Sequence, residues 1–132
     1  MKLGLSCGAT AVAVVAMTGA ASAQQAATVA AVAKGTDSLL GKKVVIADCM
    51  MMSYNTIIGA QCSPVPLDPG ALIYVDVNTL NAAGKKLGED CNTTDINNFC
   101  LLKVTGDVAK DSRGQALIKN ATLEMVKRVS AF

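Results

Sequence analysis

Few residues of this chain could do chemistry, and the cysteines are the most informative of them. Cys7 precedes an apolar N-terminal segment, and four more cysteines follow much later in the chain, at Cys49, Cys62, Cys91 and Cys100. Four cysteines in a small exported domain are typical of disulfide bonds, although their pairing stays open at this point. The chain has no Cys-x-x-Cys pair and no histidine. The sequence therefore predicts neither a structural zinc site nor a thiol–disulfide oxidoreductase.

The usual groups of acid–base and nucleophilic catalysis are also missing. Histidine, the commonest general base near neutral pH, is absent, and no Gly-x-Ser-x-Gly motif occurs. Glu89 and Asp90 adjoin each other in a polar stretch that reads as a solvated loop. Asp48 and Asp76 fall in predicted strands and could meet across a sheet, but polar residues at strand ends are the simpler interpretation. We expect a protein that is not an enzyme and that needs no cofactor.

Three consecutive methionines, Met50, Met51 and Met52, form the most unusual local sequence. Thioethers are soft ligands that suit Cu(I), and alternation along a strand would place Met50 and Met52 on one face. Two thioethers without a histidine or a free thiolate make a poor copper site, whereas methionine readily fills irregular cores. Packing is the favoured interpretation, and Cu(I) handling through Met50 and Met52 stays an alternative function.

A candidate binding surface is predicted around Tyr74 and Asp76. These two side chains alternate with the apolar Ile73, Val75 and Val77, so they should share the outward face of a half-buried strand. We predict that this face binds a protein or a small ligand. Single-stranded nucleic acid is the alternative, but aromatic residues make up 3% of the chain and its net charge is +2. Such a composition supplies neither the stacking rings nor the cationic groove that nucleic-acid binding needs.

The N-terminus has the pattern of a secretory signal. Lys2 is followed by an apolar run over residues 11–17 and by Ala21-Ser22-Ala23, which predicts a signal peptide over 1–23 with cleavage after Ala23. The run is shorter than the roughly 20 residues of a membrane-spanning helix. Cys7 stands before the run, so a lipid anchor is not favoured. We expect a periplasmic or secreted protein with no membrane span after cleavage.

The remaining residues predict a loose N-terminal piece followed by one mostly β domain. Residues 24–37 are rich in Ala and are expected to form a tail or linker, with at most a frayed helix that ends at Gly35. The domain is predicted over 38–132. A period of two favours strands, with a short helix capped by Thr79 and ended by Gly88 between the third and the fourth. The predicted strands cover about 44–53, 57–62, 71–77, 100–108 and 115–125.

This layout leads to a disulfide pairing. A hairpin turn at Asn55 and Thr56 would place Cys49 directly opposite Cys62. Cys91 and Cys100 bracket a polar loop, and a bridge between them would pin that loop to the next strand. We therefore predict the pairs Cys49–Cys62 and Cys91–Cys100.

Five strands with a helix after the third is the order of the OB-fold, a small Greek-key barrel. Three short segments, Gly41–Val44, Ile73–Val77 and Val104–Val108, resemble exported bacterial OB-fold domains of the tRNA-anticodon-binding-like type, over about residues 39–126. The resemblance implies a five-stranded OB-like barrel and brings no catalytic residue with it. The function predicted from the sequence is an exported, non-enzymatic binding or adaptor module.

Overall fold

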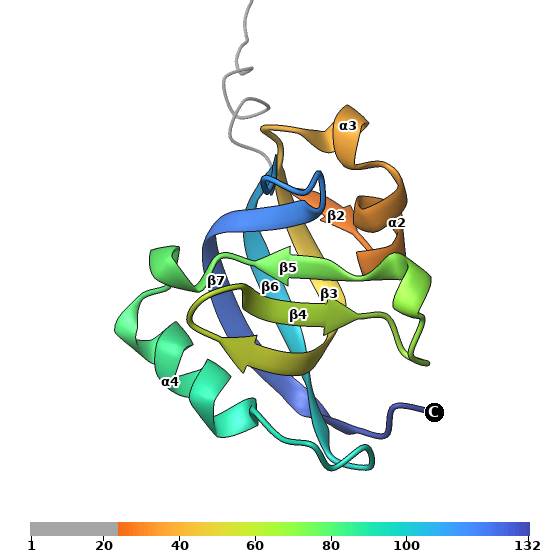
Figure 1. Ribbon diagram of the computed structural model, residues 1–132, viewed down its shortest axis with the longest axis vertical. Helices are drawn as coiled ribbons and strands as arrows, with labels where there is room; N and C mark the ends of the chain where they lie inside the picture. Colours follow the sequence, from red (N-terminus) through yellow and green to blue (C-terminus); the bar gives the residue numbers. More distant parts are fainter. Residues whose placement is uncertain (1–23) are drawn as a thin grey trace, which may run out of the picture.

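The computed structural model describes residues 24–132, and the predicted signal peptide over 1–23 lies outside them. Strands dominate the fold, and short helices fill the connections between them (Figure 1). In chain order the elements are β2 (Gln25–Ala27), α2 (Val29–Lys34), α3 (Thr36–Leu39), β3 (Lys43–Asn55), β4 (Gly59–Ser63), η2 (Pro69–Ala71), β5 (Ile73–Val75), η3 (Val77–Thr79), α4 (Ala82–Cys91), β6 (Phe99–Lys110) and β7 (Ala116–Val129).

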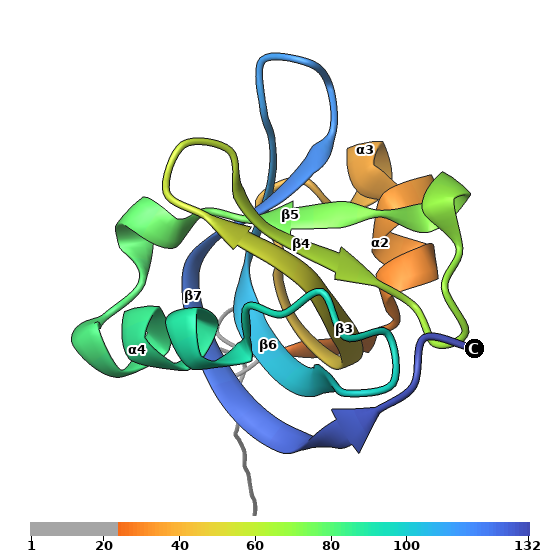
Figure 2. The same ribbon diagram turned by 60° about the horizontal axis from the view of Figure 1, so that its bottom comes forward.

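Strands β3 to β7 close into a five-stranded barrel (Figure 2). Strand β3 pairs antiparallel with both β4 and β6, β4 pairs antiparallel with β5, and β6 pairs antiparallel with β7. The ring is completed by a parallel pairing of β5 with β7. Helix α4 connects the third barrel strand to the fourth. The prediction of a mostly β, five-stranded OB-like Greek-key barrel with that helix is confirmed.

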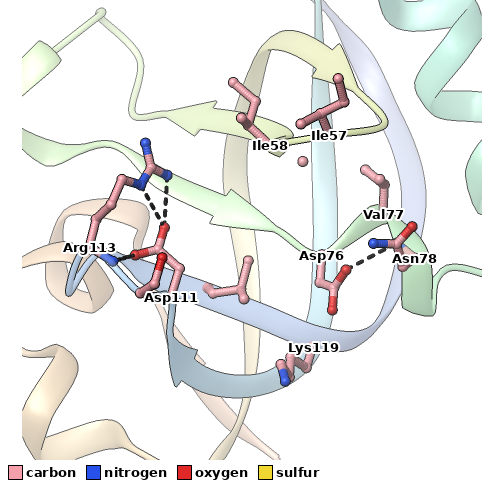
Figure 3. A pocket seen from close by; sticks show the side chains of 11 residues that line it. Ile57, Ile58, Asp76, Val77, Asn78, Asp111, Arg113 and Lys119 are labelled. Carbon is pink, nitrogen blue, oxygen red and sulfur yellow. Dashed lines mark hydrogen bonds and ion pairs between the residues drawn. The ribbon is translucent and has the colours of Figure 1, made fainter.

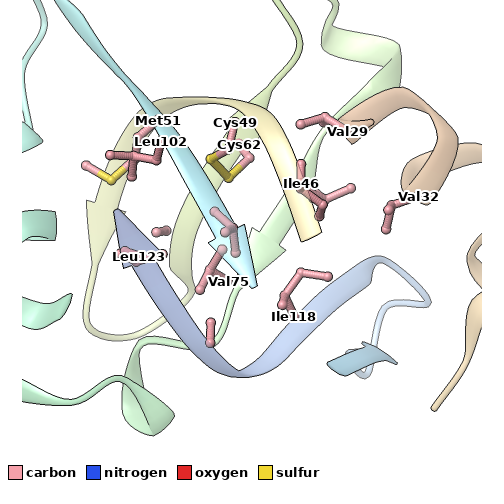
Figure 4. Packing of buried hydrophobic residues seen from close by; sticks show 14 of the residues in the cluster. Val29, Val32, Ile46, Cys49, Met51, Cys62, Val75, Leu102, Ile118 and Leu123 are labelled. Atoms are coloured by element: carbon pink, nitrogen blue, oxygen red, sulfur yellow. A yellow bond between two sulfur atoms is a disulfide. The ribbon is translucent and has the colours of Figure 1, made fainter. Parts of the chain in front are cut away.

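The barrel interior is apolar and closely packed (Figure 4). Ile46, Val75 and Ile118 come from three different strands and are fully buried there. Gly106 of β6 is required because β7 crosses it at short range. A Cβ at Gly106 would lie 2.6 Å from Cγ2 of Ile118 and 2.8 Å from the carbonyl oxygen of Lys119. The central glycine of this strand therefore permits the close approach of β7.

The expectation of a loose tail over 24–37 is wrong. Strand β2 pairs in parallel with β3, and Val29 and Val32 of α2 are fully buried in the barrel core (Figure 4). The helix has caps at both ends: the hydroxyl of Thr28 accepts a hydrogen bond from the Ala31 N–H, and Gly35 follows the last turn. Burial of the two valines stabilises a helix that would be marginal in isolation.

Both predicted disulfides are present, Cys49–Cys62 and Cys91–Cys100. The predicted hairpin register is wrong, because Cys62 lies opposite Met51 and not opposite Cys49. The turn comes later than expected. The side-chain oxygen of Asn55 accepts hydrogen bonds from the N–H groups of Ile57 and Ile58, so Ile57 and Ile58 lie in the turn and β4 starts at Gly59.

The third strand and the helix also differ from their predicted bounds. Strand β5 is only Ile73–Val75, because a 3-10 turn lies on each side of it. Turn η2 starts after Asp68 and precedes the strand, and turn η3 starts after Asp76 and follows it. Helix α4 is capped by Asn81, whose side chain accepts a hydrogen bond from the Gly84 N–H. Gly88 does not end the helix. It lies in the helix interior, under the ring of Tyr54, where there is no room for a Cβ.

Candidate binding surface around Tyr74

Tyr74 lies at the middle of β5, between two barrel neighbours. It pairs with Gln61 of β4 on one side and with Leu117 of β7 on the other. Its ring is half-buried and points outward, as the alternation predicted, while Ile73 and Val75 point into the core. The Gln61 side-chain amide donates a hydrogen bond of 3.3 Å to the Tyr74 hydroxyl.

The loop between β6 and β7 reaches over this ring. The Asp111 carboxylate accepts hydrogen bonds from the N–H groups of Arg113, at 2.8 Å, and Gln115, at 3.0 Å. Its second oxygen binds the Arg113 guanidinium at 2.8 Å. The guanidinium carbon in turn lies 4.9 Å from the centroid of the Tyr74 ring, a cation–π distance. The loop therefore holds Arg113 on the face of Tyr74.

The ionisation of this loop follows from the same contacts. Partial desolvation disfavours the charged form of Asp111, but hydrogen bonds from the Arg113 side chain and from the N–H groups of Gln115 and Arg113 outweigh it. The pKa of Asp111 is consequently lowered from 3.8. The hydrogen bond to Asp111 raises the pKa of Arg113. Both groups stay charged at neutral pH, and the loop keeps its shape there.

A cavity of about 390 Å³ lies between this loop and the β3–β4 turn (Figure 3). Ile57, Ile58 and Leu117 give it an apolar side, and Asp76, Lys119 and the ion pair of the loop give it a polar side. Ile57 is 87% exposed and Ile58 is 52% exposed. The two adjacent isoleucines form a small exposed apolar patch beside the polar groups of the cavity, an arrangement found at contact surfaces.

A second cavity, of about 380 Å³, lies on the other side of the same loop. Tyr74 and Arg113 line it together with Gln115 of the loop. Thr36 and Ala33, from the N-terminal helices, supply its far wall. Arg113 borders both cavities, whereas Tyr74 borders only the second, so the Tyr74–Arg113 pair forms a ridge beside the second cavity with the first cavity next to Arg113. We call the ridge and its two cavities the Tyr74 surface.

The two predicted strand aspartates have separate structural roles. Asp76 borders the first cavity, where its carboxylate accepts the N–H of Asn78 at 3.0 Å and starts η3. Asp48 accepts the N–H of Val29 at 2.9 Å and holds the start of α2. The two carboxylates therefore accept backbone N–H groups on different parts of the barrel. Asp76 directly follows the end of β5, as the simpler interpretation expected, whereas Asp48 lies in the interior of β3.

The methionines alternate as expected, with Met51 in the barrel core and Met50 on the opposite face. Met50 is fully buried against Phe99 and Ala131, and Met52 packs at the edge of the same cluster. Within residues 24–132, no group of three or more His, Cys, Asp or Glu side chains is placed to hold a metal ion. The contacts of Met50 and Met52 are those of apolar packing.

Sequence reasoning missed Arg113, Gln61 and the exposed Ile57 as members of this surface. The signal for Arg113 was local: an Asp two residues before it favours a turn in which the carboxylate binds following N–H groups. No signal for Gln61 was available, because its position beside Tyr74 depends on strand register. Ile57 was placed in a strand, and the Asn55 side chain puts it in the turn instead.

Comparison with known proteins supplies no relative for this surface. No family model, curated protein or solved structure matches the chain.

Proposed function

We propose that this chain is an exported, non-catalytic binding module that holds a segment of a partner protein on the Tyr74 surface. One observation carries the proposal. An outward tyrosine is fixed from above by Arg113 and from the side by Gln61; it borders the second cavity, and Arg113 borders both cavities. A ring held in this way is a preorganised contact that loses little freedom when a partner binds.

The exposed isoleucines favour a protein partner over a small molecule. A small-ligand pocket encloses most of its ligand, whereas Ile57 projects into solvent at the rim of the first cavity. Aromatic and arginine side chains surrounded by apolar groups are typical of the centres of protein interfaces. A partner segment that crosses the ridge would cover Tyr74 and Ile57 together.

The charges at the first cavity do not favour single-stranded nucleic acid. Arg113 and Lys119 are matched there by Asp111 and Asp76, so no excess of positive charge faces the ligand. Arg113 also covers the ring face on which a base would stack. A protein segment with both polar and apolar side chains fits this surface better.

Export is supported by the disulfides and by the N-terminal pattern. Two buried disulfides are typical of a protein in an oxidising, extracytoplasmic compartment. Within residues 24–132, no helix has the length and apolar character needed to cross a membrane. The signal-like pattern over 1–23 supports export to the periplasm or the medium.

Site-specific photo-crosslinking in cells that make the full chain tests the proposal. A photoreactive phenylalanine analogue replaces Ile57, and in a matched control it replaces Glu124, an exposed residue that lines neither cavity. We expect one discrete protein adduct from position 57 in the exported fraction and none from position 124. Adding Tyr74→Ala should reduce the adduct several-fold.

Two results would contradict this function. Equal adducts from both positions would mean that the surface is not selective. An adduct at position 57 that contains nucleic acid instead of protein would favour the alternative function.

A further inference from the structure

A second, smaller apolar cluster lies outside the barrel core. Its fully covered members are Met50, Phe99 and Ala131, and the side chains packed around them are Met52, Leu67, Leu101 and Val129. Ala131 belongs to the short segment Ser130–Phe132, which follows β7 and which we call the strap. Through Ala131, the strap is part of this cluster.

The strap is held in the manner of a strand between two loops (Figure 2). The Ala131 N–H donates to the carbonyl oxygen of Ile96 at 2.8 Å, and the Ala131 carbonyl oxygen accepts from the Leu67 N–H at 2.8 Å. Ile96 lies in the loop before β6, and Leu67 lies in the loop before η2. A single residue thus joins two loops, and its methyl group points into the cluster.

The seat beneath the strap has the parts of a peptide-binding groove. It offers one backbone donor, one backbone acceptor and an apolar floor that contains Met50 and Phe99. Strand addition uses this combination, in which backbone hydrogen bonds give affinity and a side-chain slot gives selectivity. Because Ala131 is fully buried, the slot selects a small side chain.

The strap is attached chiefly through Ala131. Phe132 is 79% exposed, and the contacts of Ser130 are long hydrogen bonds, the shorter of them 3.4 Å, from its hydroxyl to Asn97. Short segments held by few contacts open far more often than the whole domain unfolds. Opening would uncover large apolar side chains and leave the Leu67 N–H and the Ile96 carbonyl without partners, so a replacement strand would be favoured.

We propose that this seat is a second binding site, separate from the Tyr74 surface, for an extended partner segment with a small residue in the place of Ala131. In the structure the strap occupies this second site, so the strap competes with the partner segment for it. Val65 and Ile96 are exposed apolar residues of the two loops, and they would extend the contact with a longer segment.

The test displaces the strap in the full chain with Ala131→Asp, since a carboxylate is disfavoured in an apolar slot. The probe is a fluorescent peptide with the sequence of residues 127–132, and the measurement is fluorescence anisotropy. We expect the variant to bind the peptide at least about tenfold more tightly than the unaltered chain does, because competition by the strap is lost. Phe132→Asp, which changes an exposed side chain, is the matched control and should behave like the unaltered chain.

Further measurements complete the test. A peptide that itself carries Asp in place of Ala131 should not bind. Disulfide mapping and a cooperative unfolding transition establish whether the Ala131→Asp variant is folded. If it is not folded, the milder Ala131→Ser variant replaces it in the peptide-binding comparison with the unaltered chain. The proposal is overturned if the folded variant binds the peptide no better than the unaltered chain. Dimerisation of the variant by light scattering would also overturn it, since the occupant would then be a second copy.

Discussion

The Tyr74 surface and the strap seat differ in the polarity and the exposure of their side chains. At the Tyr74 surface, polar groups satisfy one another in the open: Asp111 holds Arg113, and Arg113 holds the ring of Tyr74. At the seat, large apolar groups are hidden, and Met50 is covered through the methyl group of Ala131. The first region is a rigid frame with an exposed contact, and the second is a closed cluster under a short cover.

This difference separates residues that stabilise the fold from residues available for binding. Burial of an apolar side chain contributes to stability in proportion to the area removed from water, so Met50 contributes to the folded state. A half-exposed ring under a surface guanidinium adds little to folding, because water replaces most of its contacts when the chain unfolds. Tyr74 can therefore take part in the proposed contact at little cost to the stability of the fold.

The largest expected effect comes from truncating one residue of each region. Met50→Ala should lower the free energy of unfolding by about 2 to 5 kcal/mol, because it removes a fully buried side chain and leaves a cavity. Tyr74→Ala should lower it by about 1 kcal/mol or less. Urea denaturation of both variants, with the disulfides intact, measures the two values. Equal losses would show that the two regions do not differ in this way.

A second, smaller effect is expected at the β3–β4 turn of the Tyr74 surface when a residue of helix α4 is substituted. Gly88 of α4 packs against the ring of Tyr54, which leads into the turn that carries Ile57. Gly88→Ala must displace that ring, and overpacking outweighs the gain in helix propensity, for a net loss of about 1 to 2 kcal/mol. We expect amide NMR shifts to change in the β3–β4 turn and to stay constant at Ala131.

Gly84→Ala is the matched control for this substitution. A Cβ there would lie 3.3 Å from the Asn81 side chain and from Leu80, contacts that small movements relieve. It should therefore cost less stability than Gly88→Ala and leave the turn unchanged. Shifts at Ala131 as large as those at the turn would mean that the two regions are coupled.

The fold could be predicted from the sequence where one face of a strand is buried. Strand β6 alternates almost perfectly, and the element order alone led to the barrel. The errors came from contacts that a linear pattern does not contain. The helix at Val29 looked too short to be stable because its partners, the core residues of the barrel, are distant in sequence. The hairpin register failed because the side chain of Asn55 moved the turn.

The candidate binding surface could be predicted from the sequence only in part, for the same reason. The alternation of apolar and polar residues was enough to place Tyr74 on the outer face of its strand. Its neighbours depend on the parallel pairing of β5 with β7, which brings the loop with Arg113 to the ring across a large sequence separation. The strap was not foreseen, since its two hydrogen bonds go to loops that have no periodic signal.

The smallest expected effect is a local titration that involves only one of the two regions. Protonation of Asp111 weakens its hydrogen bonds to Arg113 and Gln115. Because the pKa of Asp111 is lowered in the folded protein, these bonds stabilise the loop fully above about pH 4, and their contribution is lost as the pH falls through the lowered pKa. We expect the amide NMR shifts of Arg113 and Gln115 to titrate together, with a midpoint below 3.8.

Asp111→Asn is the control for this titration, because the amide oxygen can still accept the backbone hydrogen bonds but carries no charge. In that variant the two amides should not titrate with this midpoint, and the Tyr74 ring signals should differ at neutral pH because Arg113 has lost its ion pair. The Ala131 amide should stay constant in both proteins across this range. If it moves with Arg113, acid opens the strap together with the loop, and the Tyr74 surface and the seat would have to be treated as a single responsive unit.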